Sequence, residues 1–180
     1  MFFSVKELEH RIVRFDVSFP PGEIDFLDSA LRQLSPLNTE GSAELLANTL
    51  GEIRVRGRLL VTMEAECDRC LESAKFPIES NFDLFYRPAA PLQKHHAAEE
   101  VKIDEGEAEI AFYEGGGLDL KEILREHILL SMPMQRICNE LCQGMCPICG
   151  QNRNLVNCGC QAKPEDDRWS ALKKLNVRGI

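Results

Sequence analysis

The chain has 180 residues, of which 44% are hydrophobic, and it carries a formal net charge of −8. This size and composition suit one domain with its own core, or such a domain with a small appendage. The sequence has no apolar run of about 18 residues, so we expect no membrane-spanning helix, and the charged first nine residues do not resemble a secretory signal.

The first fifty residues are expected to form one strand and two helical segments. Phe15, Val17 and Phe19 alternate with polar residues and predict a strand that ends at Pro20-Pro21-Gly22. Residues 24–34 have helical spacing and predict a helix closed by Ser35-Pro36, and residues 42–50 predict another turn of helix. The apolar positions of the longer helix are Ile24, Leu27, Leu31 and Leu34.

Residues 53–66 form the clearest strand, because apolar and polar side chains alternate along most of this segment. A second alternating run covers residues 76–86. Together they predict an antiparallel hairpin with Cys67-Asp68-Arg69-Cys70 at its turn and a polar outer face.

A long polar loop, expected to be disordered, follows at residues 87–100. Short strands are expected at 101–103 and 109–113, and a tight turn or hinge at Gly115-Gly116-Gly117. This glycine run is no phosphate-binding loop, because no Lys-Ser/Thr pair follows it in register.

The best predicted helix begins after Asp119, whose carboxylate can cap it together with Glu122, and is ended by Pro133. Its apolar stripe consists of Leu120, Ile123, Leu124, His127 and Ile128. His127 is expected to pack at the edge of the core. A terminal helix is expected after Asp166 or Asp167, and Trp169 would pack it on the domain.

Six of the eight cysteines lie between Cys138 and Cys160. The segment Cys146-Pro147-Ile148-Cys149-Gly150 has the form of a zinc knuckle, in which two thiolates three positions apart bind one ion. In a reducing compartment, clustered thiols are more often metal ligands than disulfides. The candidate ligands are Cys138, Cys142, Cys146, Cys149, Cys158 and Cys160.

Six thiols exceed one four-thiolate site, so two arrangements are open. Either two of the thiols bind no ion, or a second ion is held by Cys138 and Cys142 together with Cys67 and Cys70 from the hairpin turn. An all-sulfur shell leaves no position for a reacting water, so the predicted zinc is structural. The alternative role of Cys67 and Cys70 is a redox pair, although such pairs begin a helix and this one lies between strands.

Six motifs follow one another along the chain: Val55 to Leu59, Cys67-x-Arg69-Cys70-Leu71-Glu72, Leu118-Asp119-Leu120, Ile128 to Pro133, Cys142-x-Gly144-x-Cys146-Pro147-x-Cys149-Gly150-x-Asn152 and Asp167-Arg168-Trp169. In this order they resemble the YceD-like family, the large ribosomal RNA subunit accumulation proteins of bacteria and plastids. The resemblance covers roughly residues 50–176, and the chain has Asp166-Asp167-Arg168 where the family usually has Asp-Pro-Arg.

The resemblance implies a role in accumulation of 23S ribosomal RNA and hence in large-subunit biogenesis, with no known catalytic activity. Some family members have the hairpin cysteine pair without the C-terminal cluster, which favours one site confined to residues 138–160 over two bridged sites.

The charge is distributed unevenly along the chain, and this distribution indicates which partners the protein can bind. Residues 1–130 contain 14 Lys and Arg against 25 Asp and Glu, a charge of −11, whereas residues 131–180 contain 7 against 4, a charge of +3. An acidic body repels a phosphate backbone. We therefore expect contact with a ribosomal RNA precursor through the C-terminal segment, or contact with large-subunit assembly proteins.

These observations predict an α+β protein: an antiparallel sheet or partial barrel, a packed amphipathic helix and a zinc-stapled C-terminal segment. Its parts are a body at 1–133 and a cysteine-rich segment with the terminal helix at 134–180. We expect a non-enzymatic, cytoplasmic bacterial ribosome-biogenesis factor with no membrane or small-molecule partner. The alternatives are a zinc-stabilised protein-interaction adaptor without RNA contact and a thiol oxidoreductase.

Overall fold

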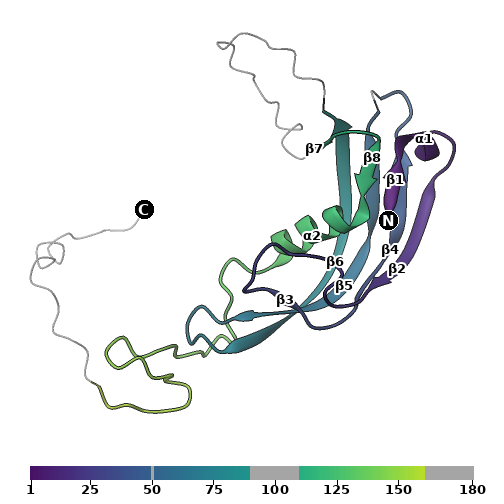
Figure 1. The fold of residues 1–180 in the computed structure, drawn as a ribbon. Coiled ribbons are helices and arrows are strands. Elements are labelled where there is room, and N and C mark those ends of the chain that lie inside the picture. Colours follow the sequence, from purple (N-terminus) through teal and green to yellow (C-terminus); the bar gives the residue numbers. More distant parts are fainter. Residues whose placement is uncertain (50, 90–109, 161–180) are drawn as a thin grey trace, which may run out of the picture.

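The computed structural model of the chain describes residues 1–49, 51–89 and 110–160 (Figure 1). It has the expected α+β class, with a mainly antiparallel sheet. The elements, in chain order, are β1 (Phe2–Ser4), α1 (Val5–Leu8), β2 (Val13–Phe19), β3 (Arg32–Gln33), β4 (Leu37–Leu45), β5 (Ile53–Glu66), β6 (Ser73–Pro88), β7 (Ile110–Tyr113), β8 (Gly117–Asp119) and α2 (Leu120–Ser131).

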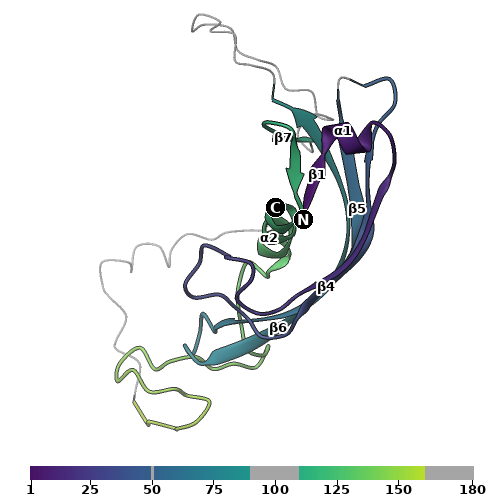
Figure 2. The ribbon, with the colours of Figure 1, turned by 45° about the vertical axis from the view of Figure 1, so that its right-hand side comes forward.

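The main sheet has the strand order β2-β4-β5-β6-β7, and β3 also pairs with β5. Its strand pairs are antiparallel except for β6 and β7, which run parallel. The sheet is strongly curved, and α2 lies on its concave side (Figures 1 and 2). A separate two-stranded ribbon joins β1 to β8 directly before α2.

The core lies between the concave face of the sheet and α2. Except at Gly57, every second residue of β5 is buried, as the sequence predicts, because one face packs inward and the other meets solvent. Leu120, Ile123, Leu124 and Ile128 form the buried side of α2, and Asp119 caps this helix by accepting a hydrogen bond from the Lys121 amide at 3.1 Å. His127 is half-buried at the edge of the core, where its Nε2 lies 2.9 Å from Ser80 Oγ.

A row of two aromatic rings and two glycines crosses four strands under the helix. Phe15 pairs with Gly41, Gly41 with Gly57, and Gly57 with Phe82. A Cβ on Gly41 would lie 2.7 Å from Phe15 Cζ, and one on Gly57 would lie 2.9 Å from Phe82 Cζ. Because neither glycine has a side chain, the strands can approach one another closely and the sheet can bend, while the two rings cover the glycine backbone.

The helix predicted at residues 24–34 is wrong. In this loop the carboxylates of Asp25 and Asp28 accept hydrogen bonds from the amides of Leu27 and Ala30, both at 2.9 Å. Such side-chain-to-backbone bonds favour turns over a helix. Leu27 has a φ of 58° and is exposed, so it lies outside the expected apolar stripe.

The helical turn predicted within residues 42–50 is also wrong. Strand β4 continues to Leu45, because every residue from Asn38 to Leu45 has a partner on β5. A turn then forms, in which Thr49 Oγ1 donates to the Leu46 carbonyl at 2.7 Å. Pairing with two neighbouring strands outweighs the weak helical preference of this segment.

The predicted strand at residues 15–19, the hairpin of residues 53–66 and 76–86 and the helix after Asp119 are confirmed. The strand expected at 109–113 is confirmed as β7, and Arg87 and Pro88 of the expected loop belong to β6. The rest of that loop from residue 90, the strand at 101–103 and the terminal helix with Trp169 lie outside the described residues. Neither α1 nor α2 has the length and apolar character that a membrane crossing requires.

Candidate metal centres

The turn of the β5–β6 hairpin and the segment after α2 bring four thiols together. These are Cys67, Cys70, Cys138 and Cys142, whose sulfur atoms lie within 4.8 Å of one another. Cys67 Sγ is 3.9 Å from Cys142 Sγ, and Cys70 Sγ is 3.8 Å from Cys138 Sγ. Three of the four side chains are buried, and only Cys138 is exposed.

A second group of four thiols follows in the same segment. Cys146, Cys149, Cys158 and Cys160 also have their sulfur atoms within 4.8 Å of one another. This group is more open, because Cys149 and Cys160 are exposed and Cys158 is half-buried. The two groups together use all eight cysteines of the chain.

Both groups fit a tetrahedral metal ion. Four thiolates about 2.3 Å from a central zinc lie about 3.8 Å from one another, which matches the two sulfur separations of the first group. An all-thiolate donor set suits zinc and other thiophilic metals rather than magnesium or calcium. Each cluster can therefore hold a metal ion.

The two Cys-x2-Cys turns have the same backbone conformation. In the first, the Leu71 amide donates to the Cys67 carbonyl at 2.8 Å, and the Cys67 amide donates to the Glu72 carbonyl at 2.9 Å. In the second, the Gly150 amide donates to the Cys146 carbonyl at 2.9 Å, and the Cys146 amide donates to the Gln151 carbonyl at 2.8 Å. Each turn is a knuckle that closes on itself and presents two sulfurs in one direction.

Backbone amides favour the ionised form of the first cysteine in each knuckle. Burial alone would raise the pKa of Cys67, but hydrogen bonds from the amides of Arg69, Cys70 and Cys138 lower this pKa to about 6. The amides of Cys149 and Ile148 likewise lower the pKa of Cys146 to about 6. A thiolate is the form that binds metal, so the backbone prepares each knuckle for an ion.

One further thiol in each cluster shows the effect of neighbouring sulfurs. Contact with Cys142 is the largest cause that raises the pKa of Cys138 to about 12. Contact with Cys149 has the same effect on Cys160, whose pKa is also raised to about 12. A bound cation would remove this repulsion between sulfurs.

Two asparagines support the first cluster from outside. Asn154 Nδ2 and Asn139 Nδ2 donate to the sulfurs of Cys142 and Cys138, respectively, each at 3.4 Å. Asn154 also accepts from the Gln143 amide at 2.8 Å, which ties the second cluster's loop to the first cluster. Such outer contacts orient metal ligands. The sequence does not single out these asparagines, because their role depends on contacts formed only in the fold.

The cysteine-rich segment is bound directly to the hairpin turn. The Met145 amide donates to the Arg69 carbonyl at 2.8 Å, and the Asp68 amide donates to the Arg136 carbonyl at 2.7 Å. Gly144 permits this approach, because a Cβ there would lie 2.9 Å from the Arg69 carbonyl oxygen. We call residues 67–72 with residues 136–160 the knuckle module. Figure 1 places it at the end of the curved sheet away from β7 and β8.

The grouping bears on the two arrangements that the sequence leaves open. The six thiols of residues 138–160 do not form one group, since Cys138 and Cys142 gather with Cys67 and Cys70. The geometry is that of the two-cluster arrangement, in which the hairpin turn supplies half of the first cluster. The Cys67–Cys70 turn connects two strands and does not lead into a helix.

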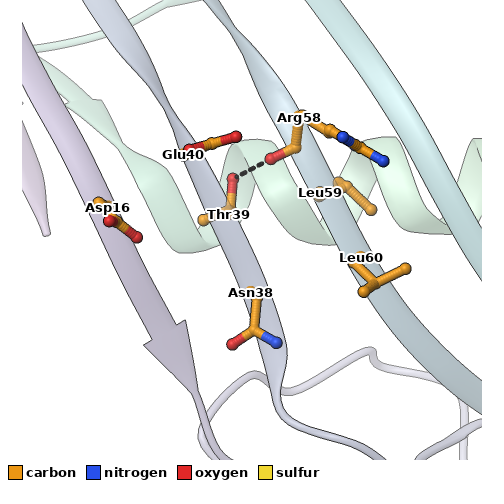
Figure 3. Close-up of a pocket in the computed structure, with 7 residues that line it drawn as sticks. All are labelled: Asp16, Asn38, Thr39, Glu40, Arg58, Leu59 and Leu60. Carbon is orange, nitrogen blue, oxygen red and sulfur yellow. Dashed lines mark hydrogen bonds between the residues drawn. The ribbon is translucent and has the colours of Figure 1, made fainter.

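A different kind of surface lies on the outer face of the sheet. A hollow of about 340 Å³ spans β2, β4 and β5 (Figure 3), and Thr39 Oγ1 donates to the Arg58 carbonyl at 3.0 Å within it. Arg58 forms an ion pair with Glu79, so the charge of this arginine is compensated. The lining residues are Asp16, Asn38, Thr39, Glu40, Arg58, Leu59 and Leu60.

Comparison with known proteins identifies relatives in bacteria and plants. The Bacillus subtilis (strain 168) protein YlbN, described as uncharacterized, is 24% identical over 176 residues, covering 96% of this chain and 93% of YlbN. The chloroplastic large ribosomal RNA subunit accumulation protein YCED homolog 1 of Zea mays is 28% identical over 141 residues, covering 64% of this chain and 46% of the maize protein.

The protein of the same name from Arabidopsis thaliana is 26% identical over 148 residues, covering 69% of this chain and 44% of the Arabidopsis protein. This chain thus spans less than half of each plant relative. No solved structure matches the chain. The family model described as large ribosomal RNA subunit accumulation protein YceD matches residues 55–176, which include nearly all of the β5–β6 hairpin, α2 and all eight cysteines. Because this match covers more than half of the chain, the protein belongs to the YceD family.

Proposed function

We propose that this protein is a non-enzymatic factor for the accumulation of 23S ribosomal RNA and the biogenesis of the large ribosomal subunit. In this proposal both thiol clusters hold structural zinc. The observation that carries it is the pairing of two four-thiol clusters in the knuckle module, in a chain whose family is named for ribosomal RNA accumulation. The zinc ions would hold the module in the shape in which it meets its partner.

Zinc is proposed because the knuckle module has few other sources of stability. Between residues 132 and 160 the described chain has no helix or strand, only a bridge between Met145 and Asn152. Several of its large apolar side chains are exposed, including Leu141 and Leu155. In such short segments the free energy of metal binding replaces that of a hydrophobic core.

The charges favour the C-terminal part of the chain over the sheet as the RNA contact. On the main sheet, three of the six arginines form ion pairs with carboxylates, and the sheet lies in the part of the chain whose charge is −11. In the knuckle module, Arg153 is exposed, and its side chain has no ion pair among the described residues. An unpaired cation can neutralise a phosphate without losing an existing partner. The paired arginines are Arg54 with Asp83, Arg58 with Glu79 and Arg87 with Glu52.

The experiment is a salt titration of binding between the zinc-loaded protein and transcripts of 23S rRNA. We expect the affinity to fall steeply with salt. Arg153→Gln should make the slope of log affinity against log salt concentration shallower by about the amount that one phosphate contact contributes. Arg58→Gln removes an exposed arginine of β5 that is already paired with Glu79, and this matched control should leave the slope unchanged. Equal slopes for the wild type and Arg153→Gln would contradict an RNA contact through the knuckle module.

The second candidate is a protein-interaction adaptor that meets no RNA. It is favoured by the charge of −11 on residues 1–130, which opposes contact with phosphate. The same titration separates the two candidates. If the zinc-loaded protein retains no rRNA at low salt, yet copurifies with large-subunit proteins after nuclease treatment, the adaptor function replaces the first proposal.

A further inference from the structure

A cavity of about 490 Å³ lies at the end of the sheet away from the knuckle module, between β7, β8 and α2. Its volume is in the range of sites that take small ligands or single long side chains. Buried apolar residues, among them Leu118 and Ile123, form part of its lining. The mouth carries two exposed rings, since Phe2 is 56% exposed and Phe112 is 65% exposed.

The charge of the cavity is uniformly negative. Its lining includes four carboxylates and no lysine, arginine or histidine. Asp119 caps α2 and lies 3.6 Å from the amino group of Met1. The side chains of Glu114, Glu122 and Glu126 have no ion pair within the part of the chain that the structure describes. Among the described residues, three of the four lining carboxylates therefore have no cation beside them.

The strongest indication of a ligand is Tyr86. This residue lines the cavity and is only 6% exposed, yet its hydroxyl has no hydrogen-bond partner among the described residues. The hydroxyl is not among the polar atoms sealed from solvent, so it can meet a ligand that enters the cavity. Burial, together with the neighbouring Glu126, raises the pKa of Tyr86 to about 12, and the phenol therefore keeps its proton.

We propose that this cavity binds the arginine or lysine side chain of a protein partner, with the carboxylates of Glu122 and Glu126 neutralising the cation and Tyr86 completing its hydrogen bonds. The exposed rings of Phe2 and Phe112 would cover the side chain's apolar stem and offer cation–π contacts. The charge of the cavity excludes a nucleic acid, because phosphate would meet only carboxylates. This site is separate from the thiol clusters and does not depend on the proposed role in RNA accumulation.

The test uses two short peptides and nuclear magnetic resonance of the isotope-labelled, zinc-loaded full chain. The probe is acetyl-Ala-Ala-Arg-Ala-Ala-amide, and the control peptide has citrulline, an uncharged isostere, in place of arginine. We expect the arginine peptide to shift the backbone amides of β7, β8 and the first turns of α2, with a dissociation constant on the order of 1 mM or tighter. The citrulline peptide should bind at least about tenfold more weakly, because it leaves the carboxylates without a cation.

Three protein variants make the test specific. The double variant Glu122→Gln with Glu126→Gln should weaken arginine-peptide binding about tenfold or more, since both carboxylates face the cation. Tyr86→Phe should weaken binding while leaving the thermal stability unchanged, because it keeps the ring and removes a hydroxyl that has no partner among the described residues. Glu9→Gln, an exposed glutamate near α1, should change neither quantity.

Several results would overturn the proposal. Equal binding of the arginine and citrulline peptides would show that charge plays no part. Shifts confined to other faces of the molecule would place the peptide elsewhere. An equal loss of affinity in Glu9→Gln and in the double variant would reduce the effect to net charge. Each outcome leaves the zinc and RNA measurements unaffected, so failure here is distinguishable from failure of the proposed function.

Discussion

Leu71 and Gly150 occupy equivalent positions in the two knuckles. Each follows the second cysteine of a Cys-x2-Cys turn, donates its amide to the carbonyl of the first cysteine, and has a left-handed backbone with φ of 62° and 72°, respectively. Glycine adopts this conformation freely, whereas leucine is strained in it. The same backbone conformation is thus adopted by a strained residue, Leu71, in the first knuckle and by an unstrained one, Gly150, in the second.

This equivalence predicts unequal responses to the two reciprocal substitutions. Gly150→Leu should destabilise the metal-loaded second cluster by about 1 kcal/mol, because it introduces left-handed strain. Leu71→Gly should change stability by less than about 1 kcal/mol, since relief of strain is offset by the greater freedom of glycine in the unfolded chain. Competition with a coloured zinc chelator measures both. A loss of zinc affinity in Leu71→Gly as large as in Gly150→Leu would contradict the equivalence.

The second prediction concerns metal content. Purified protein should contain two zinc ions per chain, and Cys70→Ser and Cys149→Ser should each remove one, because a four-thiolate site that loses a ligand binds zinc far more weakly. Limited proteolysis should then show cleavage within residues 134–160 while the sheet stays intact. Both variants retaining two ions, or the wild type holding no more than one, would refute the two-site arrangement.

The sequence predicts the sheet better than the loops, for a physical reason. Strand β5 has one face in the core and one in solvent, so burial imposes an alternation that is visible in the residues themselves. The loop before β4 has apolar residues at helical intervals, but its Asp25 and Asp28 bind the backbone in turns. Competition between local hydrogen bonds and a helix cannot be judged from spacing alone.

The ligands are visible in the sequence, but their grouping is not. Cys67 and Cys142 are separated by 75 positions, and only the docking of the cysteine-rich segment onto the hairpin turn brings them together. Conversely, two consecutive cysteines of the sequence, Cys142 and Cys146, belong to different clusters. The cavity that Tyr86 lines is not visible in the sequence either, because it depends on β7 lying parallel to β6.

The third prediction is a pH dependence of the metal-free protein. Cys146 has a pKa lowered from 9.0 to about 6, so the folded state loses this proton before the unfolded chain does. The stabilisation from this thiolate should be complete above about pH 9 and lost as the pH falls through 6. Ultraviolet thiolate absorbance should show an ionisation near pH 6 whose amplitude Cys146→Ser reduces, because Cys67 also has a pKa of about 6 and remains in that variant.

The contribution of Cys160 to stability should depend on pH in the opposite direction to that of Cys146. Its pKa is raised to about 12, so its contribution to stability is present below about pH 9 and lost as the pH rises toward 12. Chelator-treated protein should therefore resist urea best near pH 9. A metal-free protein whose thiols all ionise together near the ordinary value would show that the knuckle amides do not act on the sulfurs.

The last prediction concerns the bend of the sheet. A Cβ on Gly57 would lie 2.4 Å from the Glu40 carbonyl oxygen and 2.9 Å from Phe82 Cζ, so neither the neighbouring strand nor the ring leaves room for it. Gly57→Ala should cost about 3 kcal/mol of unfolding free energy, as overpacking of a rigid site does. Gly116→Ala is the control, because a Cβ there meets nothing within 4 Å.

Urea denaturation of both variants measures the difference. The slope of the transition should stay the same while the midpoint of Gly57→Ala falls, since the substitution changes the native packing and not the surface exposed on unfolding. If Gly57→Ala is as stable as Gly116→Ala, the strands separate easily at this point, and the close approach of β4 and β5 does not determine the curvature that holds α2 against the sheet.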